Sequence, residues 1–264
     1  MMANAHADNP PNGLTLYHLN ISTCSQKVRI ALAEKGLAYE GRQLDRSKLE
    51  HLSDWYLKIN PNGVAPSLVH NGAPVIDSSV ICEYLDEVFP DPPLSPPSPL
   101  GRAQMRAWMR YFEEVPTAAI RVPSFNAFKG LHRASLGEQA FDAYTEKLPL
   151  RKHFYRQMGE HGFDRQKTEE SIERLSACLK RVSGALADGR PYLLGEAFTI
   201  ADILLVPTIV RLEDLRLAAL WHDLPNVAAW YARVQARPSF AIAYADGARI
   251  DLDAMAPIGP ATPS

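Results

Sequence analysis

The sequence predicts an α/β domain followed by an all-α domain, with a proline-rich segment between them. In roughly the first ninety residues, short apolar strands alternate with amphipathic helices. Six prolines fall within residues 89–99, which predicts an extended, semi-rigid linker. From about Gly101 onward, apolar residues recur at helical spacing, as Met105, Trp108, Met109 and Phe112 do. With 264 residues and 46% hydrophobic content, the chain has enough apolar surface to fill the cores of two small domains.

The first strand leads directly into hydroxyl and thiol residues. Residues 14–19 have the pattern of a half-buried strand, and the apolar residues that follow residues 22–25 (Ser-Thr-Cys-Ser) predict an amphipathic helix. Unpaired backbone N–H groups at the start of a helix stabilise negative charge by roughly 0.3–1 kcal/mol at exposed sites. A thiolate is therefore stabilised there, either that of Cys24 itself or that of a ligand held by a hydroxyl group. The alternative is that Ser22 or Thr23 is simply the N-cap of the helix.

A β-hairpin follows, because a strand after Pro66 turns at Asn71-Gly72 into another strand. A cis bond between Ala65 and Pro66 would turn the Ala65 backbone toward solvent or a ligand. Its N–H and C=O groups could then pair with a peptide-like ligand. After the hairpin, Asp77 and Ser78 open another helix, whose N-terminus can receive a carboxylate.

Residues 116–163 of the helical half are rich in aromatic and basic side chains. These include Arg121, Phe125, Phe128, Lys129, His132, Arg133, Tyr144, Arg151, His153, Phe154, Tyr155 and Arg156. Two interpretations stay open: the segment roofs an acceptor site, or it is a solvated connection whose aromatic side chains pack inward.

Thr199 and Asp202 have the spacing of a capping box at the start of an apolar helix, with Phe198 and Ile203 as the hydrophobic staple. We expect this motif to serve folding rather than catalysis, and loss of the cap to cost about 1 kcal/mol or more.

Composition excludes several classes of function. The net charge of −2 gives no basic footprint for nucleic acid or an anionic membrane, so neither partner is expected. No apolar run is long enough to span a bilayer, no secretory leader is apparent, and the histidines lack metal-ligand spacing. The three cysteines form no paired framework, which fits a reducing compartment. Cys82 and Cys178 are expected in the core, so Cys24 is the one reactive thiol candidate.

Over roughly residues 14–246 the chain resembles the cytosolic glutathione transferases. The residues that carry the resemblance are Ser22-Thr23-Cys24-Ser25, Val64-Ala65-Pro66, Asp77-Ser78 and Phe198-Thr199-Ile200-Ala201-Asp202-Ile203. It implies a disordered lead-in (1–13), a thioredoxin-like glutathione-binding domain (14–90), a proline-rich linker (91–100), an all-helical domain (101–250) and a flexible tail (251–264). Two bacterial branches are the most similar, the tetrachlorohydroquinone reductive dehalogenases and the β-etherases that cleave lignin-derived aryl ethers.

The resemblance implies an enzyme that activates the glutathione thiol for attack on a small hydrophobic, aromatic electrophile. The reaction would be conjugation, reductive dehalogenation or β-aryl ether cleavage. The expected catalytic residues are Ser22, Cys24 and Ser25, with Thr23 as a further hydroxyl candidate. The expected glutathione ligands are Ser22, Val64, Ala65, Pro66, Asp77 and Ser78.

Two of these residues depart from the common family pattern, since Ala65 replaces valine and Asp77 replaces glutamate. A backbone contact does not need the valine side chain, and aspartate keeps the carboxylate with a shorter reach.

No metal is expected. The resemblance also implies a homodimer in the cytoplasm. Alternatives are a thiol–disulfide or deglutathionylation activity through Cys24, or a non-catalytic binding protein of the same fold.

Overall fold

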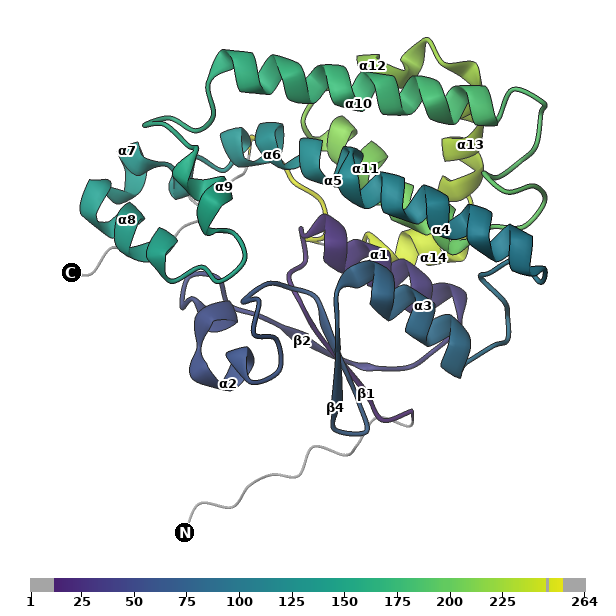
Figure 1. Cartoon of the computed structure of the whole chain (residues 1–264), viewed down its shortest axis with the longest axis horizontal. Coiled ribbons are helices and arrows are strands. Elements are labelled where there is room, and N and C mark those ends of the chain that lie inside the picture. Colours follow the sequence, from purple (N-terminus) through teal and green to yellow (C-terminus); the bar gives the residue numbers. More distant parts are fainter. Residues whose placement is uncertain (1–11, 246, 254–264) are drawn as a thin grey trace.

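The computed structural model describes residues 12–245 and 247–253 and shows a small sheet domain packed against a larger helical domain (Figure 1). The predicted α/β-then-α architecture is confirmed. The strands are β1 (Leu14–His18), β2 (Glu40–Gln43), β3 (Ser67–His70) and β4 (Ala73–Ile76). The helices of this domain are α1 (Thr23–Glu34), the 3-10 turn η1 (Glu50–Leu52), α2 (Asp54–Leu57) and α3 (Ser78–Val88).

The helical domain contains a long bundle and a cluster of short helices. The bundle comprises α4 (Pro99–Glu114), α5 (Pro116–Ala119), α10 (Arg165–Ala185), α11 (Ile200–Asp214), α12 (Ala219–His222), α13 (Pro225–Gln235) and α14 (Pro238–Ala243). The cluster comprises α6 (Arg121–Ala127), the 3-10 turn η2 (Lys129–Leu131), α7 (Arg133–Leu136), α8 (Glu138–Glu146) and α9 (Lys152–Arg156).

The four strands lie in the order β2-β1-β3-β4, with β1 parallel to β2 and antiparallel to β3. The predicted hairpin is confirmed: Val69 pairs with Pro74, and Asn71 and Gly72 form the turn with φ of 50° and 85°. Positive φ at both turn positions suits Asn-Gly and matches the twist of the strands.

Strand alternation divides the side chains of β1 between two cores. Leu14 and Leu16 lie in the main core, which also includes residues of α1, α3, α4 and α11. Tyr17 points to the opposite face and packs with Leu44 and Tyr56 of the α2 region. Because α1 is covered by the sheet on one side and by α11 and α14 on the other, its residues from Ser25 to Leu32 are all buried.

The proline-rich segment between α3 and α4 is held at several points. The Leu94 side chain is buried, its N–H donates to Asp86 at 2.8 Å, and its C=O accepts from the Ile200 N–H at 2.9 Å. Lys35 donates to the Pro92 carbonyl at 2.6 Å and forms an ion pair with Asp86. The predicted domain boundaries at 90 and 101 stay predictions; α3 ends at Val88, and α4 begins at Pro99.

The predicted terminal segments lie mostly outside the described residues, which exclude 1–11 and 254–264. The two described residues of the predicted lead-in contact the sheet domain: Asn12 donates to the Ala38 carbonyl at 3.2 Å, and the Gly13 carbonyl accepts from the Asn71 N–H at 3.0 Å. At the other end, Asp253 forms an ion pair with Arg216 at 2.6 Å.

The capping box is confirmed at the start of α11, where Asp202 Oδ2 accepts from both the N–H and the hydroxyl of Thr199 at 3.0 Å. Phe198 and Ile203 are both buried in the main core, as expected for the staple. Within the part of the chain that the structure describes, no helix has the length and apolar character needed to cross a membrane.

Candidate active site

A cavity of about 680 Å³ lies between the two domains. From the sheet domain it is lined by Leu19, Asn20, Ile21, Ser22, Thr23, Cys24, Gln43, Leu44, Asp45, Arg46, Ser47, His51, Gly63, Val64 and Ala65. From the helical side and the chain end it is lined by Ile120, Arg121, Ser124, Phe125, Phe128, Tyr144, Leu148, Arg151, Tyr155, Arg211 and Gly247. The structure therefore brings the start of α1 and the turn before β3 to one cavity with the short helices α6–α9.

Ser22 is the N-cap of α1, in extended conformation with φ of −72° and ψ of 121°. Its Oγ accepts a hydrogen bond from the Ser25 N–H at 3.3 Å, so the expected capping interaction is present. Ser22, Thr23 and Cys24 are partly exposed and line the cavity. Capping uses a lone pair of the Ser22 oxygen and leaves its O–H free to donate, so the capping role and a ligand-binding role are compatible.

Ser25 has a different environment from the other three residues of this segment. Its side chain is fully buried, its Oγ accepts from the Leu19 N–H at 3.3 Å, and it does not line the cavity. The third residue of the helix faces inward here, so its hydroxyl braces the loop between β1 and α1. The structure thus places Ser25 behind the cavity wall and gives its hydroxyl a structural partner, while the catalytic role stays an untested prediction.

The turn before β3 presents free backbone groups to the cavity. The Ala65–Pro66 bond is cis, with Val64 and Ala65 lining the cavity and Pro66 buried behind them. The Val64 carbonyl accepts from the Tyr56 hydroxyl at 2.7 Å and from the Asn60 amide at 2.8 Å, which fixes the turn. The Ala65 N–H and C=O form no hydrogen bond with any residue in the described ranges 12–245 and 247–253, and are available to a ligand.

Asp77 and Ser78 lie at the start of α3 and do not line this cavity. Asp77 is the N-cap, with φ of 73°, and its Oδ1 accepts from Ser79 N–H at 2.9 Å, Ser79 hydroxyl at 2.7 Å and Val80 N–H at 3.2 Å. The positive φ holds an aspartate in a conformation that side chains rarely adopt. Asp77 is exposed, whereas Ser78 is buried.

Three cations surround Cys24 closely enough to interact with it electrostatically, namely Lys27, Arg151 and Arg211. Lys27 is 1% exposed and donates to Glu113 at 2.6 Å and to Thr117 at 3.1 Å. Burial lowers the pKa of Lys27, but its interactions with Cys24 and Glu113 outweigh that effect and raise the pKa above its ordinary value. Lys27 is therefore held in its charged form between Glu113 and the start of α1.

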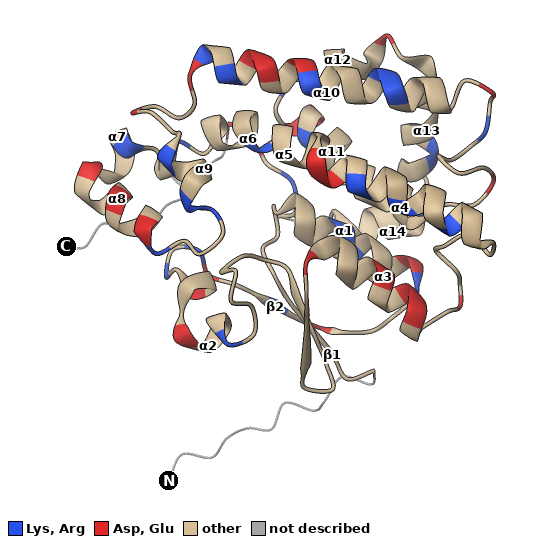
Figure 2. Cartoon of the chain, viewed as in Figure 1, with Lys and Arg blue, Asp and Glu red and all other residues tan. Residues whose placement is uncertain are grey.

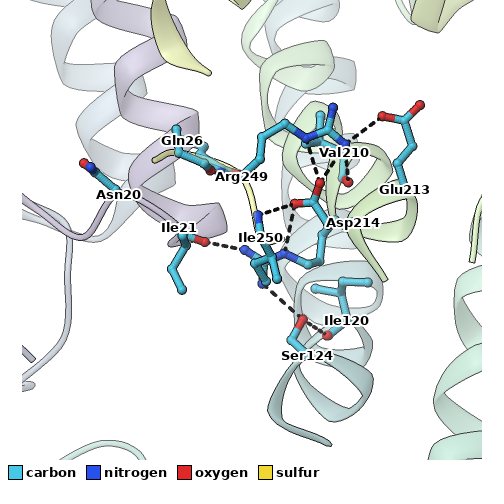
Figure 3. Close-up of polar contacts among 12 residues, drawn as sticks. Asn20, Ile21, Gln26, Ile120, Ser124, Val210, Glu213, Asp214, Arg249 and Ile250 are labelled. Carbon is cyan, nitrogen blue, oxygen red and sulfur yellow. Dashed lines mark hydrogen bonds and ion pairs between the residues drawn. The ribbon is translucent and has the colours of Figure 1, made fainter. Parts of the chain in front are cut away.

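Arg211 of α11 holds the loop before α1 against the helical domain. Its guanidinium donates to the Ile21 carbonyl and to the Ser124 hydroxyl, the latter at 3.2 Å, and forms an ion pair with Asp214 at 3.8 Å. Burial lowers its pKa to about 10. Figure 3 shows Asp214 also binding Arg249, at 2.7 Å, so the network reaches the C-terminal segment.

Sequence reasoning gave no role to any of the four arginines in the cavity lining. Arg121 and Arg151 fall within the segment noted for its basic and aromatic residues, whereas Arg46 and Arg211 were missed. A signal for Arg211 was present, because it lies directly between Val210 and Leu212 in a mostly apolar stretch of helix.

Residues 116–163 form short packed helices, and some of their side chains line the cavity; a role in an acceptor site stays a prediction. Phe141 and Tyr155 are buried in a small core with Tyr144 and neighbouring aromatic residues, so aromatic side chains pack inward. Other side chains of the segment, among them Arg121 and Phe125, line the cavity. The segment is both a packed subdomain and one wall of the cavity.

The three thiols differ in accessibility. Cys24 is partly exposed, whereas Cys82 is 0% and Cys178 1% exposed. Burial raises the pKa of both Cys82 and Cys178, to about 12 in the case of Cys178.

We expect iodoacetamide to modify Cys24 alone in the folded protein and all three thiols in urea, as peptide mass spectrometry can determine. Modification of Cys82 or Cys178 at a comparable rate in the folded protein would contradict this assignment.

Within residues 12–245 and 247–253, no three His, Cys, Asp or Glu side chains come together in a group that could hold a metal ion.

Comparison with known proteins identifies the family. The model of the glutathione S-transferase N-terminal domain matches residues 16–93, and that of the glutathione S-transferase C-terminal domain matches residues 165–233. Protein LigF of Sphingobium sp. (strain SYK-6) is 30% identical over 250 residues, covering 90% of this chain and 96% of the relative. The chain belongs to the glutathione S-transferase family.

Within this family, the crystal structure of the β-etherase LigF has a TM-score of 0.77 at 29% identity, over 88% of this chain and 98% of that one. A tetrachloro-p-hydroquinone reductive dehalogenase of Sphingobium chlorophenolicum is 27% identical over 86% of this chain and 94% of its own length. A glutathione S-transferase of Methylobacterium radiotolerans, solved in complex with glutathione sulfonate, has a TM-score of 0.66 at 26% identity, over 88% of this chain and 94% of that one.

Proposed function

We propose that this glutathione transferase activates the thiol of glutathione for attack on a small hydrophobic, aromatic electrophile bound in the interdomain cavity. One observation carries the proposal: Ser22 and Cys24 at the start of α1 share a cavity with the free backbone of Ala65 and with aromatic residues of α6, α8 and α9. Conjugation, reductive dehalogenation and β-aryl ether cleavage all begin with this thiolate, so they share the same starting geometry.

In the proposed complex, glutathione lies along the sheet-domain wall. The Ala65 N–H and C=O pair with its peptide backbone, as a short antiparallel strand would. We place the γ-glutamyl group of glutathione at Asp77 and Ser78, with its ammonium toward the Asp77 carboxylate and its carboxylate toward the N-terminus of α3, and with Val64 and Pro66 shaping the turn. The sulfur then lies near Ser22.

The Ser22 hydroxyl donates a hydrogen bond to the sulfur in this proposal, and the start of α1 with its nearby cations adds to the stabilisation of the thiolate. Lowering a thiol pKa by two units takes about 2.7 kcal/mol, since each unit is worth 1.36 kcal/mol. A charge-assisted hydrogen bond of roughly 1.5–3 kcal/mol together with the helix N-terminus can supply this free energy. The thiolate attacks the electrophilic carbon and the leaving group departs with the bonding electrons.

A second chemistry is favoured by the partial exposure of Cys24 beside Lys27, Arg151 and Arg211. In it, the Cys24 thiolate attacks the sulfur of a glutathionyl–substrate adduct and forms a mixed disulfide. The substrate carbon leaves with the electron pair and takes a proton, which gives the reduced product. Free glutathione then attacks the mixed disulfide, which releases glutathione disulfide and restores Cys24.

Incubation with glutathione disulfide, followed by intact-protein mass spectrometry, separates the two chemistries. If Cys24 takes part in thiol exchange, we expect one glutathionyl adduct on the wild-type protein and none on Cys24→Ala. Absence of the adduct while glutathione still binds would contradict a role for Cys24 in exchange and favour conjugation or ether cleavage dependent on Ser22. Failure to bind glutathione at millimolar concentration would instead favour a non-catalytic binding protein.

We also propose a homodimer and a cytoplasmic location, in line with the family resemblance. Exposed apolar side chains on the outer helices α3 and α4, Val80, Val88 and Leu100, fit a dimer surface. Light scattering is expected to give twice the chain mass of 29.3 kDa, and a monomer mass would contradict this proposal.

A further inference from the structure

We propose that the acceptor is an anionic aromatic electrophile, whose carboxylate or equivalent charged group is bound by Arg121 and Arg151. This inference deepens the proposed transfer function and rests on it. It names the class of acceptor that the helical wall of the cavity would select.

Arg121 and Arg151 come together from distant parts of the chain. Arg121 is the first residue of α6, Arg151 immediately precedes α9, and both line the cavity. Figure 2 shows positively charged residues at the start of α6 and along α9. Arg151 interacts electrostatically with both Arg121 and Cys24, which places the pair near the start of α1.

Neither of these two guanidinium groups has an anionic partner. Among the described residues, no carboxylate lies within 4.0 Å of either one, and neither side chain donates a hydrogen bond to a protein acceptor. By contrast, Arg46 donates to the Tyr155 hydroxyl at 3.4 Å, and Arg211 is held by Ile21, Ser124 and Asp214.

Two neighbouring positive charges that are partly removed from water repel each other, and an anion bound between them would offset that repulsion. Both side chains are only partly exposed. Burial, and next to it the charge of Arg121, lowers the pKa of Arg151, so the site disfavours its own positive charge in the absence of a ligand. A carboxylate between the two guanidinium groups would remove this repulsion and accept paired N–H donors.

The cavity itself supplies no carboxylate for this purpose. Its lining holds four arginines against one acidic residue, Asp45. Asp45 Oδ1 accepts from the Ser47 N–H at 2.9 Å and its hydroxyl at 2.6 Å, and Oδ2 pairs with Lys48 at 3.1 Å. Glu113, outside the lining, also interacts favourably with Arg151 but is itself paired with Lys27 at 2.6 Å.

Arg46 follows β2 and donates to the Tyr155 hydroxyl, whereas Arg121 and Arg151 lie on the helical side of the cavity without such a partner among the described residues. Phe125, Phe128 and Tyr155 line the cavity on the same helical side. A ring with an attached anionic group matches both the aromatic and the charged parts of this wall.

The test compares an acidic acceptor with its neutral amide, using 4-chloro-3,5-dinitrobenzoate and the corresponding benzamide. We expect the wild-type protein to prefer the benzoate in kcat/KM. In the double variant Arg121→Met/Arg151→Met, this preference should fall by about tenfold to hundredfold, through KM for the benzoate, because a charge-assisted contact is lost. Because Arg151 also interacts with Cys24, its loss should lower kcat with both acceptors alike, so the readout is the ratio of the two kcat/KM values; KM for glutathione should stay within about twofold.

Two variants serve as comparisons. Arg165→Met removes an exposed arginine of α10 that pairs only with Glu169, and is expected to leave the preference unchanged. Arg151→Lys keeps the charge without the planar fork and is expected to retain part of the preference. An unchanged benzoate preference in the double variant would overturn the proposal, as would a rise in KM for glutathione in place of KM for the benzoate.

Binding measurements separate this inference from the proposed activity. If the wild-type protein turns over neither acceptor, the transfer function fails with these substrates, and calorimetric binding of 3,5-dinitrobenzoate against 3,5-dinitrobenzamide still decides the anion site. Tighter benzoate binding that depends on Arg121 and Arg151 supports the site. Equal binding of the two compounds overturns it.

Discussion

Replacement of Ser22 with alanine is expected to lower glutathione transfer by about tenfold to hundredfold, because the thiolate loses a charge-assisted hydrogen bond. The remaining stabilisation comes from the start of α1 and the cations near Cys24, so some activity should persist. The pKa of bound glutathione should rise, so at saturating glutathione the acidic limb of the kcat/KM profile for the electrophile should move to higher pH. Steady-state rates from pH 5 to 9 would measure both effects.

The capping role of Ser22 requires a matched control. Ser98 caps α4 with the same geometry, accepting from the Gly101 N–H at 3.0 Å, and does not line the cavity. Ser98→Ala and Ser22→Ala should each lose about 1 kcal/mol of stability, the usual cost of an N-cap. Only Ser22→Ala should lose transfer activity. If its activity stays within a few-fold of wild type, the assignment to Ser22 is wrong, and Thr23 becomes the next hydroxyl to test.

Replacement of Asp202 with alanine is expected to destabilise the folded protein by about 3–5 kcal/mol, because it leaves several buried donors without an acceptor. The Asp202 side chain is 0% exposed. Its Oδ1 accepts from the Leu193 N–H at 3.0 Å and from Trp230 Nε1 at 2.9 Å, in addition to the contacts that Oδ2 makes with Thr199. The Asp202 carboxylate therefore connects the start of α11 both to α13 and to the loop that precedes α11.

Urea unfolding at fixed protein concentration would measure this loss. Asp142→Ala provides the comparison, since Asp142 is an exposed partner of Arg133 at 2.8 Å, and removal of a surface ion pair costs about 1 kcal/mol or less. Asp202→Asn should also be strongly destabilising, because its amide N–H₂ would face two donors. A loss for Asp202→Ala no larger than that for Asp142→Ala would show that the buried contacts contribute little.

Features set by short stretches of sequence were predictable. The Asn71-Gly72 turn is specified by residues that tolerate positive φ, and the capping box at Thr199 and Asp202 by groups three residues apart. The start of α1 was predictable for the same reason, since a strand period changes to a helix period around Ser22. These interactions are local, so the sequence pattern contains all the partners they need.

The cavity was not predictable in the same way. Which hydroxyl at the start of α1 faces a ligand depends on what packs beneath the helix, and burial against Leu19 removes Ser25 from the cavity lining. Asp77 and Ser78 begin a helix as expected, yet they lie outside the cavity lining. Lys27 is buried in α1 despite its charge because Glu113 and Thr117, far along the chain, supply its partners.

The sequence by itself determined the fold class, the hairpin at Asn71-Gly72, the helix starts at Ser22, Asp77 and Thr199, and the family. Only the tertiary structure decided that Arg121, Arg151 and Arg211 meet near Cys24 in one cavity. The physical reason is that secondary structure and caps follow from neighbours within a few residues, whereas the charge around a site is summed over side chains that only folding brings together.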